Sequence, residues 1–228
     1  MNIGGFIPLS LVDWDGEPCS VVFVTGCQFR CPWCHNKDIV FDKVHMQVVT
    51  PKMTTDAVCI TGGEPTIQKG LISFCKLLKQ SGKKIKLDTN GMKPDILFEL
   101  LNRELIDYIA MDIKAPLVTK KYSKSTGVQL KEEWLTILLE SISLITRAAP
   151  SYEFRTTIVP TFHIPKDIEQ IAKYAIKGAK KYVIQNFRPC DSLIDHNLAS
   201  LKPFSQTELE AFAEAAKPFV QRVTFRTL

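Results

Sequence analysis

The chain has 228 residues, of which 45% are hydrophobic and 23% are charged. That composition supplies enough apolar side chains for one sizeable core, so it excludes a disordered tail and a fibrous protein. The net charge of +5 comes from 29 basic and 24 acidic residues that are spread along the chain. Basic residues that are scattered or form only short clusters usually lie on a solvated surface, so we expect no nucleic-acid partner.

The N-terminus lacks the charged start and the longer apolar core of a secretory signal, and Asp13, Asp15 and Glu17 follow soon after it. The most apolar stretch, residues 134–148, is shorter than the roughly 20 apolar residues that span a bilayer. We therefore expect a cytoplasmic protein with no membrane partner. The cysteine count of seven is odd, and in a reducing compartment clustered thiols favour metal or redox chemistry over disulfides.

Short apolar runs rich in β-branched residues alternate with helical patterns along the chain. Strands are predicted at residues 20–24, 57–60, 84–87, 108–111, 154–159, 182–184 and 220–225. Helices are predicted at residues 71–80, 94–101, 134–148 and 164–176, and Ser205-Gln-Thr-Glu208 is a capping box before a last helix. Residues 115–133 are polar and basic, contain Gly127 and are predicted as a surface loop. This alternation indicates an α/β fold with parallel strands, either an open doubly wound sheet or a barrel.

Cys27, Cys31 and Cys34 directly follow the first predicted strand. Three thiolates at this spacing can bind one metal centre, and a [4Fe-4S] cluster normally takes four cysteines, so one iron would stay open. Three alternatives compete: a haem-attachment motif from Cys31 to His35, a thioredoxin-like pair, and structural zinc with His35 as the fourth ligand. Haem attachment needs an exported context and a redox pair needs no Cys27, whereas zinc stays open on this loop alone.

The segment Gly62-Gly63-Glu64-Pro65 follows the next predicted strand. Two glycines let the backbone approach a ligand closely, and Glu64 can accept a hydrogen bond from an ammonium group. A C-x3-C-x2-C loop with an aromatic residue, Trp33, before its last cysteine resembles the radical S-adenosylmethionine (SAM) enzymes. The resemblance implies that the three cysteines hold a [4Fe-4S] cluster, and that Trp33 and the Gly62–Glu64 segment contact SAM.

Within that superfamily the sequence is most similar to the glycyl-radical-enzyme activating proteins, above all the one that serves anaerobic ribonucleoside-triphosphate reductase. Pyruvate formate-lyase activating enzymes are related. The similarity covers nearly the whole chain and is carried by residues 6–16, Cys34-His35-Asn36, residues 87–91 and residues 111–114. It implies one radical SAM domain over residues 1–228, folded as a partial (β/α)6 barrel of parallel strands with outer helices.

The resemblance also implies a reaction and two protein partners. SAM would be cleaved reductively to methionine and a 5′-deoxyadenosyl radical, which would abstract a hydrogen atom from a glycine of a glycyl radical enzyme. A reduced flavodoxin or ferredoxin would supply the electron. Two alternative functions remain: a radical SAM enzyme that acts on a small molecule such as a deazapurine precursor, and a non-catalytic zinc-binding module.

Charged residues at later strand ends complete the predicted site. Asp112 and Lys114 are two residues apart, so both side chains point to one face of the strand, where an exposed ion pair is the alternative. The resemblance implies SAM contacts for Asp88, Asn90, Asp112 and Lys114. It also implies a possible Na+ or K+ site at Asp88, Thr89, Met111 and Asp112.

Three further positions are less defined. Arg155 starts a predicted strand, where it pairs with a carboxylate of the cofactor or target peptide, or forms a buried structural ion pair. The pyruvate formate-lyase activators have a cofactor-contacting histidine near residues 185–188, and either Gln185 or Arg188 takes that role here. Asp15 stands where related proteins often have proline, which predicts only a variant surface turn. Most of these motifs fall at or just past the carboxyl end of a predicted strand, the face where parallel barrels place their active sites.

Overall fold

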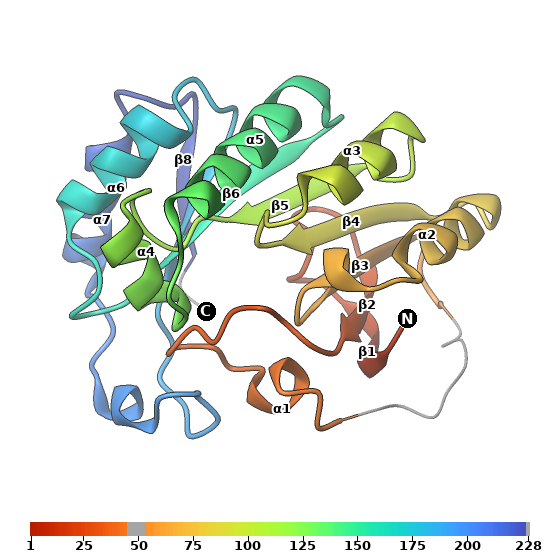
Figure 1. The fold of residues 1–228 in the computed structure, drawn as a ribbon, viewed down its shortest axis with the longest axis horizontal. Coiled ribbons are helices and arrows are strands. Elements are labelled where there is room, and N and C mark those ends of the chain that lie inside the picture. The colour runs from red at the N-terminus through yellow and green to blue at the C-terminus, as the bar shows by residue number, and fades with distance from the viewer. Residues whose placement is uncertain (45–52, 227–228) are drawn as a thin grey trace.

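A computed structural model describes residues 1–44 and 53–226. Its eight strands form one curved sheet in which neighbours in space follow the order of the chain, from β1 to β8 (Figure 1). Every neighbouring pair from β2 to β8 is parallel, and only β1 runs antiparallel to its neighbour. The strands are β1 (Ile3–Ser10), β2 (Cys19–Val24), β3 (Ala57–Gly62), β4 (Lys84–Thr89), β5 (Tyr108–Asp112), β6 (Tyr152–Ile158), β7 (Tyr182–Asn186) and β8 (Val223–Arg226).

Helices connect the parallel strands, as the sequence predicted. They are α1 (Lys37–Val40), α2 (Leu71–Gln80), α3 (Pro94–Asn102), α4 (Thr119–Thr126), α5 (Glu132–Ala148), α6 (Pro165–Gln170) and α7 (Gln206–Ala216), with short turns η1 (Pro65–Ile67), η2 (Ile171–Ala175) and η3 (His196–Ser200). Six strand–helix units, from β2 to α7, are followed by β8. The predicted partial (β/α)6 barrel with outer helices is therefore confirmed.

The two faces of the sheet carry different side chains. Residues such as Ile60, Leu87 and Ile109 are fully buried in the main core together with residues of the outer helices. The alternate positions point to the concave face, where a small second cluster gathers around Trp14 and Cys59. Because successive strand residues point to opposite faces, polar residues between the core positions are directed into the barrel.

Strand β1 is missing from the sequence prediction, which treated all strands as parallel. It pairs with β2 through residues such as Phe6 and Val22, and its other edge has no strand partner within the described residues. Pro8 lies in this strand, and an edge strand tolerates proline because one side of its backbone has no ladder partner. The glycines and proline in the segment masked its strand pattern.

The predicted helices agree with the structure at most of their ends. Helix α2 has the predicted bounds, and Ser205 caps α7 in the predicted capping box, where its backbone N–H donates to Glu208 at 2.7 Å. The predicted helix at residues 164–176 is divided, because α6 ends at Gln170 and continues as the π-helical turn η2. Over the described part of the chain, no helix is long and apolar enough to cross a membrane.

The surface loop predicted for residues 115–133 is wrong, because the segment contains helix α4 and the start of α5. Helix α4 has few apolar residues, so its sequence carries no helical apolar stripe. It is held by tertiary contacts: Tyr122 is fully buried, and the Thr126 carbonyl accepts a 2.7 Å hydrogen bond from the Arg30 backbone N–H. Gly127 adopts a left-handed conformation and ends the helix, so this glycine marks a helix stop.

Candidate active site

One cavity at the carboxyl ends of the strands collects nearly all of the predicted site residues. It is lined by the cysteine loop and by the ends of β3, β4, β5 and β6. The predicted residues that line it are Cys27, Cys31, Trp33, Cys34, Gly62, Gly63, Glu64, Asp88, Thr89, Asn90, Asp112, Lys114 and Arg155. Four motifs that are far apart in the sequence therefore meet in one place, where a parallel barrel positions catalytic loops.

Backbone hydrogen bonds hold the cysteine loop in place. The Cys34 N–H donates to the Cys31 carbonyl at 2.9 Å and forms a turn between two of the cysteines. The Pro32 carbonyl accepts a hydrogen bond of the same length from the Asp195 N–H, so a distant loop supports the turn from outside. His35 lies outside the cavity lining, and its Nε2 is 2.7 Å from the Arg188 carbonyl.

The donor set of the loop fits a [4Fe-4S] cluster. Burial raises the pKa of the Cys27 thiol to about 12 and that of Cys31 to about 11, and burial also raises the pKa of Cys34. Iron binding would therefore release protons from these thiols. Over residues 1–44 and 53–226, no group of three or more Cys, His, Asp and Glu is arranged to hold a single metal ion. A cubane differs, because each thiolate binds a different iron atom.

The Gly62-Gly63 pair packs the β3 loop against the start of the cysteine loop. A Cβ atom on Gly63 would lie 2.0 Å from the Gly26 carbonyl oxygen, and one on Gly62 would lie 2.7 Å from backbone atoms of Val24. The Glu64 N–H donates to the same Gly26 carbonyl at 2.8 Å. In this structure the close approach that requires glycine is made to the protein's own backbone.

Glu64 ties the β3 loop to the end of β4. Its side chain is 1% exposed and accepts hydrogen bonds from the Thr66 N–H and hydroxyl, the Thr89 hydroxyl and the Asn90 N–H, at 2.6–3.0 Å. Burial raises the pKa of Glu64, and these donors oppose that change. The carboxyl group also lines the cavity. That it binds an ammonium group stays a prediction.

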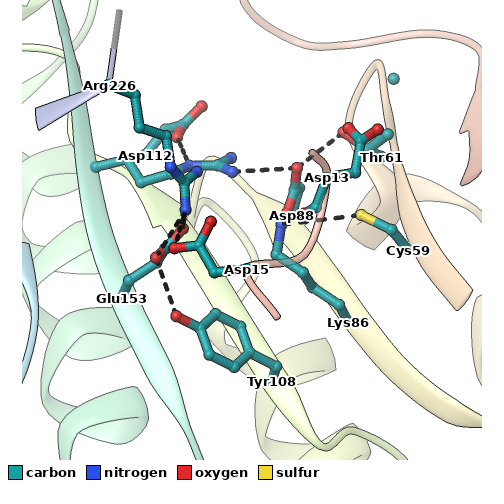
Figure 2. Close-up of polar contacts among 12 residues, drawn as sticks. Asp13, Asp15, Cys59, Thr61, Lys86, Asp88, Tyr108, Asp112, Glu153 and Arg226 are labelled. Carbon is teal, nitrogen blue, oxygen red and sulfur yellow. Dashed lines mark hydrogen bonds and ion pairs between the residues drawn. The ribbon is translucent and has the colours of Figure 1, made fainter. Parts of the chain in front are cut away.

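A chain of ion pairs, which we call the mouth cluster, is made of Lys86, Asp88, Asp112, Lys114 and Arg155, and all of these residues except Lys86 line the cavity. Arg155 lies between the two carboxylates, with Nε 2.7 Å from Asp112 and a terminal nitrogen 3.2 Å from Asp88. Lys114 Nζ is 2.8 Å from Asp112, and Lys86 Nζ is 2.8 Å from Asp88. Figure 2 shows three members of this cluster, Lys86 and Asp88 on β4 and Asp112 on the neighbouring β5.

The mouth cluster has three cations and two carboxylates, so it has one unbalanced positive charge. Burial alone would raise the pKa of Asp88 and Asp112, but Arg155 and a neighbouring lysine hold the pKa of each below its ordinary value. Burial alone would lower the pKa of Lys114, but Asp112 raises it. The pKa shifts of Lys86 and Arg155 are also upward, so the direction of the shift favours the charged form of all five groups. The predicted structural ion pair of Arg155 is present, in the cavity wall.

A second group of charges, which we call the floor cluster, comes from the amino ends of β5 and β6, the residue before β7 and the β1–β2 loop, together with Arg226 at the end of β8. It consists of Asp15, Tyr108, Glu153, Lys181 and Arg226, of which Figure 2 labels all but Lys181. Glu153 is 1% exposed and pairs with Lys181 at 2.8 Å, while Asp15 pairs with Lys181 at 2.8 Å and with Arg226 at 2.7 Å. Asp15 therefore does more than form a surface turn, because it joins the β1–β2 loop to the last two strands.

Two predicted residues do not line the cavity. Met111 is fully buried beside Gly91, and Gln185 lies on β7 opposite Thr157, which does line the cavity. Sequence reasoning missed Lys86 and Glu153. Both stand two residues before a charged residue on the same strand, the spacing that identified Asp112 and Lys114, so the same rule applied to β4 and β6 would have found them.

Comparisons with known proteins show what this chain is similar to. The sequence model of the Radical SAM superfamily matches residues 21–175. A Methanocaldococcus jannaschii protein named "putative glycyl-radical enzyme activating enzyme" is 32% identical over 240 residues, which cover 99% of this chain and 96% of that protein. A 7-carboxy-7-deazaguanine synthase of Thermoplasma acidophilum is 29% identical, over 55% of this chain and 62% of that protein.

The fold also has a match among solved structures. Streptococcus suis SuiB bound to the precursor peptide SuiA has a TM-score of 0.60 and 12% identity over 91% of this chain and 48% of that one. The chain thus spans about half the length of the solved structures it matches. With a superfamily match over most of the chain and a relative similar along its full length, the protein belongs to the radical SAM superfamily of iron–sulfur enzymes.

Proposed function

We propose that this protein activates a glycyl radical enzyme, with anaerobic ribonucleotide reductase as the partner, in the cytoplasm. The [4Fe-4S] cluster would be bound by Cys27, Cys31 and Cys34, and reduced flavodoxin or ferredoxin would supply its electron. When bound, the cluster and SAM supply a 5′-deoxyadenosyl radical that removes a hydrogen atom from a glycine Cα of the partner. Glycine suits such a target because it has no Cβ to block a close approach.

The observation that carries this proposal is the presence of an acidic and a basic side chain in the cavity beside the three thiols. The amino-acid part of SAM has an ammonium and a carboxylate group, which need an anionic and a cationic partner. Glu64 would provide the first and Lys114 the second, and both residues line the cavity. Both side chains are held by hydrogen bonds or ion pairs, so the site is preorganised.

The chain's own residues also protect the reacting centre. Phe29 and Trp33 are 2% and 5% exposed and line the cavity beside the cysteines, so they keep water from that side. The Cys27 Sγ accepts a hydrogen bond from the Phe29 N–H at 3.4 Å, and the Asn90 amide lies 3.8 Å from it. Hydrogen bonds to cluster sulfurs tune the reduction potential. A cation at Asp88, Thr89, Met111 and Asp112 remains part of the proposal.

The second candidate is a radical SAM enzyme that acts on a small molecule. The similarity to 7-carboxy-7-deazaguanine synthases supports it, but covers only about half of this chain. The match to the glycyl-radical enzyme activating relative covers 99% and favours the first candidate. Zinc binding without catalysis has lost its support, because the chain belongs to an enzyme superfamily and His35 points to the Arg188 carbonyl.

The proposal is tested by changing Cys31→Ala in protein that has been reconstituted anaerobically with iron and sulfide. We expect production of 5′-deoxyadenosine from SAM to fall to background, because two cysteines cannot hold the cluster in a reactive state. Chromatography of the products and iron analysis measure both effects. Cys75→Ala is the matched control, since Cys75 is a fully buried thiol in α2, outside the cavity lining.

A separate experiment, electron paramagnetic resonance, tests which partner the protein activates. The wild-type protein with SAM and reductant should produce a glycyl radical signal on anaerobic ribonucleotide reductase. Normal SAM cleavage by the Cys31→Ala protein would refute the cluster assignment. Cleavage without any glycyl signal, combined with turnover of a deazapurine precursor, would favour the second candidate.

A further inference from the structure

His163 contacts two residues of the cavity lining, Lys114 and Trp33, and is absent from every motif that the sequence displays. It is 2% exposed and belongs to the turn that follows β6, where Thr161 has a positive φ of 73°. A left-handed conformation is unusual for a β-branched residue. The turn directs the imidazole ring back toward the end of β5 and toward the cysteine loop.

The hydrogen bonds of His163 fix which nitrogen carries the proton. The Val159 backbone N–H donates to Nδ1 at 3.0 Å, and because an amide can only donate, Nδ1 must be unprotonated. Nε2 is 2.8 Å from the Lys114 carbonyl, which can only accept, so Nε2 carries the hydrogen. Burial lowers the pKa of His163, which agrees with a neutral ring.

The bond from Nε2 holds Lys114 at a point where the sheet no longer does. Strand β5 ends at Asp112, and the Ile113 N–H donates to the Arg155 carbonyl at 2.8 Å. Beyond that point, the Lys114 N–H donates to the Tyr122 hydroxyl at 3.3 Å, and its carbonyl accepts from His163. Both backbone groups of Lys114 are thus fixed by side chains from other elements.

The same ring also supports the cysteine loop. The His163 ring packs edge-on against Trp33, with ring centres 5.5 Å apart, and the neighbouring Phe162 packs against Trp33 at 5.1 Å. Trp33 lies between Cys31 and Cys34 and is 5% exposed. One turn after β6 therefore contacts both the lysine in the cavity lining and the loop that carries the thiols.

We propose that His163 is a positioning residue. It orients Lys114 toward the carboxylate of SAM and fixes the position of that lysine relative to the cysteine loop. The proposal rests on the proposed function in taking the cavity as the SAM site. The hydrogen bond to the Lys114 carbonyl carries the effect on SAM, and the ring contact with Trp33 carries the effect on the loop.

Two amide variants separate the two hydrogen bonds of the ring. His163→Asn keeps an acceptor near the Nδ1 position for the Val159 N–H but is too short to reach Lys114. His163→Gln places an amide N–H near the Nε2 position and keeps the bond to Lys114. Tyr152→Phe is the control, because it also removes one buried hydrogen bond, from the Lys180 N–H, at the opposite end of β6.

Each variant is reconstituted with iron and sulfide, and its SAM dissociation constant is measured by anaerobic titration calorimetry. We expect His163→Asn to weaken SAM binding about five- to tenfold, the loss that one hydrogen bond accounts for, with His163→Gln within about twofold of wild type. The paramagnetic resonance spectrum of the reduced cluster should change on SAM addition in the wild type and the Gln variant, and less in the Asn variant. Tyr152→Phe should bind SAM normally.

Wild-type affinity in His163→Asn, or equal weakening in both amide variants and the Tyr152→Phe control, would overturn the positioning role. If His163→Asn does not fold, His163→Gln decides, since a Gln variant that folds but binds SAM about tenfold more weakly would also refute it. Failure of the wild-type protein to bind SAM would instead refute the proposed function.

Discussion

The mouth cluster and the floor cluster place similar charged groups inside the same barrel, but their charges differ. The mouth cluster has three cations and two carboxylates, whereas the floor cluster balances Asp15 and Glu153 against Lys181 and Arg226. A buried charge is costly unless it is compensated. The charges of the floor cluster are matched within the cluster, whereas the mouth cluster places Lys114 and Arg155 in the lining of a cavity that contains three thiols.

Their positions along the strands explain this difference. The β1–β2 loop packs against the floor cluster. Its Trp14 contacts Tyr108 with ring centres 5.7 Å apart, and its Asp15 forms an ion pair with Arg226 of β8. The mouth opens into the cavity formed by the strand-end loops. Charge at the closed end therefore stabilises the barrel alone, whereas charge at the open end stabilises the barrel and also prepares a binding site. Three substitutions test this division.

The largest effect is expected for Arg155→Met. This change leaves Asp88 and Asp112 facing each other without the guanidinium between them, and removal of one partner from a buried ion pair costs about 3–5 kcal/mol. Urea unfolding followed by circular dichroism measures the loss, and SAM binding should also weaken. Arg222→Met, at an exposed position before β8, should change the free energy of unfolding by less than about 0.5 kcal/mol. Equal effects from both would show that the mouth cluster is not a stabilising unit.

A smaller effect is expected for Glu153→Gln in the floor cluster. The variant loses a buried charge that pairs with Lys181 and accepts a 2.9 Å hydrogen bond from Tyr108, but Asp15 still faces both cations. The free energy of unfolding should fall by about 1.5–3 kcal/mol, the range for hydrogen bonds to charged groups. The SAM dissociation constant should not change. A marked loss of SAM affinity at wild-type stability would contradict the division, and exposed Glu214→Gln is the control.

The smallest effect is expected for Asp15→Asn. Partial burial would raise the pKa of Asp15, but hydrogen bonds from Lys181 and Arg226 lower it from 3.8 to about 2. The side chain is 54% exposed, so the ion pairs should contribute only about 0–1 kcal/mol at neutral pH.

This contribution has a defined pH dependence, because the pKa is lower in the folded state. It is fully present above the unfolded pKa and is lost as the pH falls toward the folded value of about 2. The stability gap between wild type and Asp15→Asn should therefore shrink below about pH 4, measured on cluster-free protein since cluster ligands must be deprotonated. A gap that is constant with pH would show that Asp15 acts through packing.

Much of the fold and site was accessible from the sequence, and the errors have physical causes. Strand–helix alternation predicted the parallel part of the barrel, because its buried strands are nearly continuous apolar runs. Edge strand β1 was not predicted, because Pro8 and the glycines interrupt its strand pattern. Helix α4 was not predicted, because polar residues, many of them with hydroxyl groups, stand where an apolar stripe would indicate a helix. Residues two apart on a strand point to the same face, and the prediction used this rule for Asp112 and Lys114 but not for the charged residues of β4 and β6, where it also holds.

The sequence by itself determined the superfamily, the three cysteines and the end of the strands where the site lies, because these depend on local spacing and strand order. Only the tertiary structure decided which charges meet. Asp112 lies opposite Arg155 because β5 and β6 pair in one register, and that register is a property of the assembled sheet. His163 reaches Lys114 across 49 positions of sequence through a turn whose direction no local pattern displays.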